Sequence, residues 1–115
     1  MLKSCPCIVY VVDNLAQSRR WYEQNLGGKV VEDAPGWVGI RLESGQMIGL
    51  HQREPGQPRN PVCAFYRVDD IKAALAQLTS AGSEIIHELT DVGTVLIAIV
   101  RNPDGLPIGL QQTKG

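Results

Sequence analysis

Residues 7–28, CIVYVVDNLAQSRRWYEQNLGG, contain the clearest structural signals in the chain. Its first six residues are mostly β-branched or aromatic and predict a buried strand. Asp13 and Asn14 are good N-cap residues, and apolar side chains then recur at helical spacing from Leu15 to Leu26. The following glycine pair tolerates the left-handed backbone that ends a helix. The stretch therefore predicts a strand, a capped helix and a glycine stop.

After residue 28 we expect three strands in the first half, around 29–32, 37–42 and 47–52, separated by turns rich in Gly, Pro and Ser. The turn at 43–45 leaves two registers open. A type I turn with Gly45 in the left-handed region would pair Leu42 with Gln46, whereas a two-residue turn would reverse the faces of the strand before it. We favour the first, because it places the aliphatic side chains under the helix.

The second half repeats the first. After a segment with three prolines and no aliphatic residue, 53–61, we expect a strand at 62–68, a helix from Ile71 to Ala81, and strands around 84–87, 94–100 and 107–112. The letters VDNL at 12–15 match VDDI at 68–71, and IGLHQ at 48–52 matches IGLQQ at 108–112. We predict an α+β fold: one domain, 1–115, made of two β-α-β-β-β repeats, 1–54 and 60–115, joined by the linker 53–61.

Composition narrows the function classes. The 115 residues are 43 % hydrophobic and 20 % charged, with a net charge of −1, as expected of a folded domain. No basic stripe suggests nucleic acid as a partner, and no apolar run reaches the roughly 20 residues of a membrane span. The N-terminus lacks the regions of a signal peptide, so we expect a cytoplasmic protein. Three cysteines, an odd number, are expected to stay reduced.

The run 7–22 closing on Leu26-Gly27, together with 68–71, 81–82, 102–105 and 108–110, resembles the glyoxalase, bleomycin-resistance and extradiol-dioxygenase proteins, the vicinal oxygen chelate superfamily. The resemblance implies an open, curved mixed sheet whose concave side encloses a cavity, with the helices on the convex side. It also implies metal ligands, usually His or Glu, at four cavity positions. Carried over by register, these positions are Cys7, Gly49, Cys63 and Gly109. Two glycines cannot donate, so we predict no metal and no other cofactor.

Strand alternation sorts the residues that would face this cavity. We predict ligand contacts from Cys7, Val9, Trp37, Arg41, Gly49, His51, Cys63, Phe65, Arg67, Gly109 and Gln111. We assign no catalytic residue.

Several of these side chains allow a second interpretation. His51 could contact a ligand or be a partly solvated strand residue, Arg67 could pair with an anion or extend to the rim, and Trp37 could stack on a ligand or pack a loop. The two glycines could leave room for a ligand or mark close strand packing. The cysteines could converge on a soft metal, although buried structural thiols are commoner.

The leading hypothesis is a metal-free protein that binds and sequesters a small molecule with an apolar or aromatic body and a polar or anionic group. The alternative is a lyase, isomerase or dioxygenase with an atypical site that uses His51 or thiols; a third possibility is an accessory domain without a ligand. We also expect a homodimer, because strands lined by Cys7, Val9, Phe65, Ile97 and Ile99 would leave a large apolar surface on one chain.

Overall fold

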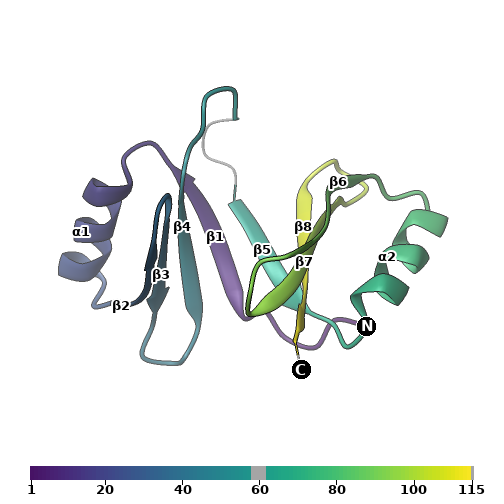
Figure 1. Ribbon diagram of the computed structural model, residues 1–115, viewed down its shortest axis with the longest axis horizontal. Coiled ribbons are helices and arrows are strands. Elements are labelled where there is room, and N and C mark those ends of the chain that lie inside the picture. The colour runs from purple at the N-terminus through teal and green to yellow at the C-terminus, as the bar shows by residue number, and fades with distance from the viewer. Residues whose placement is uncertain (58–61, 115) are drawn as a thin grey trace. The chain divides into compact units, whose positions relative to one another are not determined.

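The computed structural model describes residues 1–57 and 62–114, which form two compact units (Figure 1). The first unit is Cys7–Val62, and the second joins Met1–Pro6 to Cys63–Gly115. The N-terminal residues, predicted as part of the first repeat, thus pack with the second unit. They run beside β5, where the Lys3 N–H donates to the Arg67 carbonyl and the Arg67 N–H donates to Ser4, both at 2.9 Å.

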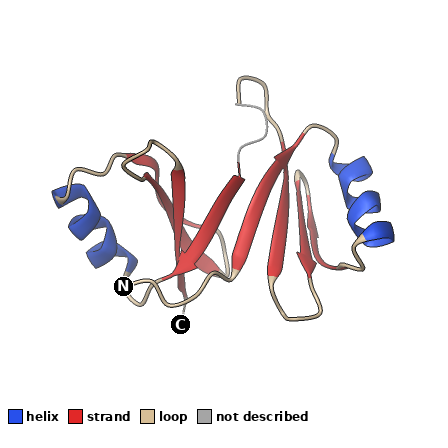
Figure 2. Cartoon of the chain, turned by 180° about the vertical axis from the view of Figure 1, so that it is seen from behind, coloured by secondary structure: helices blue, strands red, loops and turns tan. Residues whose placement is uncertain are grey.

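The first unit contains β1 (Cys7–Val12), α1 (Leu15–Asn25), β2 (Lys29–Ala34), β3 (Trp37–Arg41) and β4 (Met47–Gln52). Its strands lie in the order β2-β3-β4-β1, with β1 parallel to β4 and the other pairs antiparallel. The second unit contains β5 (Val62–Arg67, whose first residue groups with the first unit), α2 (Ile71–Ser80), β6 (Ile85–Asp91), β7 (Val95–Arg101) and β8 (Pro107–Thr113), with its strands in the order β5-β8-β7-β6. Figure 2 shows one helix beside the strands of each unit. The predicted α+β fold of two β-α-β-β-β units is confirmed.

The same two kinds of hydrogen bond hold the N-terminus of each helix. Asn14 and Asp70 are the N-caps, and their side chains accept hydrogen bonds from the backbone N–H groups three residues on, at 3.0 and 3.1 Å. The last strand of each unit adds a brace: the Gln52 side chain accepts from the Leu15 N–H at 3.0 Å, and the Gln112 side chain accepts from the Ile71 N–H at 2.8 Å. These bonds satisfy backbone donors that a helix start leaves without intrahelical partners.

The two cores differ in depth. In the second unit, α2 buries Ile71, Ala74 and Leu75 against the sheet. In the first unit the core contains Val38, Ile40 and Leu50, and α1, which is described in full, buries none of its residues. No helix among the described residues is long and apolar enough to cross a membrane.

Some boundaries differ from prediction. β2 and β6 run beyond their expected ends at Glu32 and His87, because each is continued by pairing with the next strand across register shifts. Residues 53–57 of the predicted linker are described, and the Arg53 N–H donates to the Val12 carbonyl at 2.8 Å, so this part belongs to the first unit. Residues 58–61 lie outside the described part.

Candidate functional site

The side of each sheet that faces away from its helix, called here the helix-distal face, carries the predicted site residues. Directly paired residues share a face of a sheet, so the register fixes which side chains accompany one another. In the first unit this face has three rows across β2, β3, β4 and β1: Lys29, Arg41, Met47 and Cys7; then Glu32, Gly39, Gly49 and Val9; then Ala34, Trp37, His51 and Val11.

The favoured turn geometry is confirmed. The Leu42 N–H donates to the Gln46 carbonyl at 2.8 Å, and Gly45 has φ +93°. Val38 and Ile40 therefore lie under α1, as expected, and Trp37 and Arg41 lie on the helix-distal face.

The room above Gly49 is occupied by the indole of Trp37. A Cβ built at Gly49 would meet the ring, 2.7 Å from its Cζ3 and 2.8 Å from its Cζ2, so a side chain fits here only if the indole moves. Gly109 in the second unit is covered in the same way by Phe65, whose Cδ1 would lie 2.5 Å from an added Cβ. Each glycine allows close aromatic packing, and a ligand above it would contact the ring.

His51 lies between Trp37 on β3 and Val11 on β1. Its Nδ1 is buried and has no hydrogen-bond partner within the part of the chain that the structure describes. A buried polar atom without a partner is uncommon and costs about 1–3 kcal/mol. A polar group of a ligand that reached this nitrogen would remove that cost.

Glu32 belongs to the same face and was missed by the sequence analysis. Its side chain lies over Gly39, where an added Cβ would sit 2.9 Å from the Glu32 Cβ and 3.1 Å from its carboxyl carbon. Among the described residues this carboxylate has no hydrogen bond or ion pair. The register shift between Val30 and Glu32 breaks the alternation of faces along β2, so alternation does not predict the face of Glu32. The one sequence signal is Gly39 on the paired strand, which leaves room for the Glu32 side chain.

The helix-distal face of the second unit carries Cys63, Phe65, Arg67, Gly109 and Gln111 on β5 and β8. Phe65 is 7 % exposed, whereas the Arg67 side chain is exposed. The register therefore brings together Cys7, Val9, Trp37, Arg41, Gly49 and His51 in one unit, and the other five predicted residues in the other.

Cys63 is a poor thiolate donor. Burial, with a smaller contribution from Cys5, raises the pKa of its thiol from the ordinary value of 9.0 to about 11, and a hydrogen bond from the Gly109 backbone opposes this only in part. The thiol is therefore protonated at neutral pH, which disfavours nucleophilic attack, because attack requires the thiolate.

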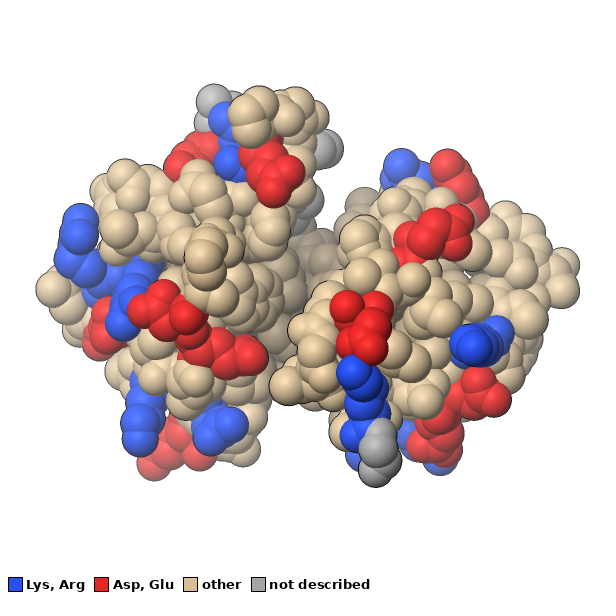
Figure 3. Space-filling model, in the orientation of Figure 1, with Lys and Arg blue, Asp and Glu red and all other residues tan. Residues whose placement is uncertain are grey.

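The metal chemistry implied by the fold does not fit these residues. Two of the four expected ligand positions are glycines, which have no side chain to donate and are covered by aromatic rings. Within residues 1–57 and 62–114, no group of three or more His, Cys, Asp or Glu side chains is arranged to hold a metal ion. On the face drawn in Figure 3, acidic and basic side chains are interspersed over each unit.

The sequence model of the Glyoxalase/Bleomycin resistance protein/Dioxygenase superfamily matches residues 6–110, and the chain belongs to this superfamily. No curated protein matches it significantly in sequence.

Solved structures agree in fold. Methylmalonyl-CoA epimerase from Mycobacterium tuberculosis is 21 % identical, with a TM-score of 0.74 over 99 % of this chain and 90 % of that one. A superfamily member from Vibrio splendidus 12B01 is 18 % identical, with a TM-score of 0.74 over 97 % and 99 %. An extradiol ring-cleaving dioxygenase from B. fuscum is 19 % identical, with a TM-score of 0.78 over 99 % of this chain and 33 % of that one. At these identities the likeness concerns the fold alone.

Proposed function

We propose that this protein binds a small molecule without a metal, and that the helix-distal face of the first unit provides the main contacts. The observation that carries the proposal is the indole of Trp37, laid over Gly49 beside the unpartnered Nδ1 of His51. An aromatic surface with a few convergent polar groups is the usual composition of a ligand site.

The charges on this face suggest the kind of ligand. Arg41 pairs in register with Lys29, and within the described residues neither side chain has an ion-pair partner. Four residues along β3 separate Trp37 from Arg41, about 13 Å at the rise of a strand. A planar apolar body on the indole, with a carboxylate directed toward Arg41, suits this arrangement.

Sequestration is favoured over metal-dependent turnover because Gly49 and Gly109 supply no metal ligands. One observation favours the alternative, a lyase, isomerase or dioxygenase with an atypical site. Glu32 lies in the row of Gly39 and Gly49, His51 lies in the adjacent row of the same face, and the two could act as acid and base.

NMR titration of ¹⁵N-labelled protein with benzoate and 1-naphthoate tests the proposal. We expect shifts at the Trp37 indole N–H and the Gly49 amide, larger for 1-naphthoate because it covers more of the indole. Trp37→Ile, which introduces the residue found at the equivalent position 97, should weaken binding, and Trp21→Phe is the matched control. Unperturbed Gly49 and Trp37 signals with both probes would contradict the proposal.

We further propose a homodimer, with apolar residues of the helix-distal faces, such as Val9 and Ile97, covered by a second chain. Light scattering at micromolar concentration should give twice the chain mass of 12.6 kDa. A monomer mass would contradict this assembly.

A further inference from the structure

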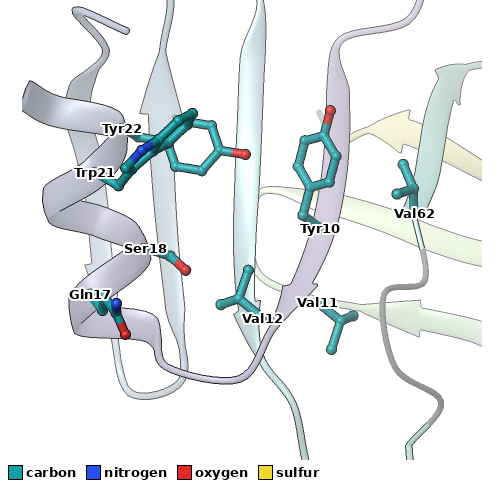
Figure 4. Close-up of a pocket in the computed structure, with 8 residues that line it drawn as sticks. All are labelled: Tyr10, Val11, Val12, Gln17, Ser18, Trp21, Tyr22 and Val62. Atoms are coloured by element: carbon teal, nitrogen blue, oxygen red, sulfur yellow. The ribbon is translucent and has the colours of Figure 1, made fainter. Parts of the chain in front are cut away.

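The helix side of the first unit contains a hollow, on the side opposite to the face described above. A cavity of about 350 Å³ lies between α1 and the strand β1 (Figure 4). Figure 4 shows the side chains of Tyr22, Trp21 and Tyr10 along one part of it and those of Ser18 and Gln17 along another. Its lining is Tyr10, Val11, Val12, Gln17, Ser18, Trp21, Tyr22 and Val62, and none of these residues is charged.

Comparison with the second unit shows what makes this hollow. The repeated letters at 12–15 and 68–71 align Ser18 with Ala74 and Tyr22 with Leu78. In the second unit Ala74 is buried in the core cluster, at 4 % exposure, and Leu78 packs against that cluster. The first unit has hydroxyl-bearing residues at the same places, and its helix packs without burying a residue. The cavity therefore lies where the first unit has Ser18 and Tyr22 in place of the aliphatic residues of the second unit.

The polar groups of the cavity are unused. Within the described residues, the hydroxyls of Tyr10, Tyr22 and Ser18 make no hydrogen bond, and neither does the indole N–H of Trp21. The rings stand close together: Tyr10 and Tyr22 have centroids 6.5 Å apart, and Trp21 meets Tyr22 edge to face at 5.1 Å. Burial, with a smaller contribution from Tyr10, raises the pKa of Tyr22, so its hydroxyl stays a neutral donor at physiological pH.

We infer that this cavity is a second binding site, for a neutral, planar small molecule that carries hydroxyl or amide groups. The aromatic walls match a planar body, and the unused hydroxyls and amide match its hydrogen-bonding edge. The lining residues that the structure describes carry no charge, which disfavours an ion, because an ion would lose hydration without gaining a counter-charge. The site is distinct from the proposed one, because its aromatic and polar lining residues do not lie on the helix-distal face; Val11, which lies in the row of Trp37 and His51, borders both sites.

Titration with phenol, followed by NMR of the ¹⁵N-labelled chain, tests the inference. We expect saturable shifts at the Trp21 indole N–H and at the Ser18 and Gln17 amides, and weaker ones there with benzoate. The double variant Ser18→Ala, Tyr22→Leu introduces the residues of the second unit and should bind phenol about tenfold less tightly, while remaining folded. Trp37→Ile should leave the phenol response unchanged, which separates this site from the proposed one.

Three outcomes would overturn the inference. Phenol shifts spread evenly over the chain would indicate non-specific contact. Unchanged phenol affinity in the double variant would show that the hydroxyls of Ser18 and Tyr22 do not bind phenol. If phenol gives no response and the same amides instead shift on dilution, the cavity is covered by a second copy of the chain.

Discussion

The two units share one plan and differ in what their helices do. At position 75 the second unit has Leu75, which enters the core, whereas the aligned Arg19 in the first unit reaches Asp33, with Nη1 and Oδ2 2.6 Å apart. Capping residues, bracing glutamines and ring-covered glycines are common to both. The helix of the second unit therefore contributes to the core. The first unit instead has aromatic and polar side chains on both sides of its sheet.

The largest loss of stability is expected from removing the first apolar side chain of α2. Ile71 is fully buried, so Ile71→Ala should cost about 2–5 kcal/mol, whereas Leu15→Ala at the matched, half-buried position should cost clearly less. Urea unfolding of both variants measures the free energies. Equal losses would mean that the two cores contribute alike.

The covered glycines should respond next most strongly. Gly49→Ala and Gly109→Ala should each cost about 1–3 kcal/mol, because the new methyl group meets Trp37 or Phe65. Adding Trp37→Ile to Gly49→Ala should restore part of the loss, since the obstructing ring is removed. Thermal unfolding in a double-mutant cycle gives the coupling, and strict additivity would show that the ring is not the obstacle.

The bracing glutamines should have a smaller effect. Gln112→Ala removes the acceptor of the Ile71 N–H and should cost about 1 kcal/mol. Gln52→Ala should cost more, because the Gln52 side chain also donates to the Asp13 carbonyl at 2.6 Å. Denaturant midpoints at a constant slope compare the two, and the reverse order would contradict the hydrogen-bond assignment.

The smallest effect is the pH dependence due to Cys63. Its folded pKa of about 11 lies above the ordinary value of 9.0, so the unfolded chain loses the proton first. Stability due to this thiol is therefore fully present below pH 9.0 and is lost as the pH rises toward about 11. Unfolding of wild type and Cys63→Ala across this range should show a shallower decline in the variant. Parallel curves would mean that burial does not perturb the thiol.

Features that depend on residues close together in the chain could be predicted from the sequence. The N-caps, the glycine stops and the turn at Gly45 follow from local backbone preferences, and the faces of β1, β3, β4 and β8 follow from strict alternation. The repeated letters predicted the duplication, and the resemblance of the motifs to the superfamily is confirmed by the family model over residues 6–110.

Tertiary structure decided what depends on register and packing. The shift before Glu32 brought an unpredicted carboxylate onto the helix-distal face, and Met1–Pro6 joined the second unit through hydrogen bonds to Arg67. The rings over Gly49 and Gly109 could not be predicted, because alternation assigns a face but not the direction a side chain takes across it. The cavity beside Tyr22 likewise depends on how closely α1 approaches the sheet, a distance that side-chain volumes set only when both surfaces meet.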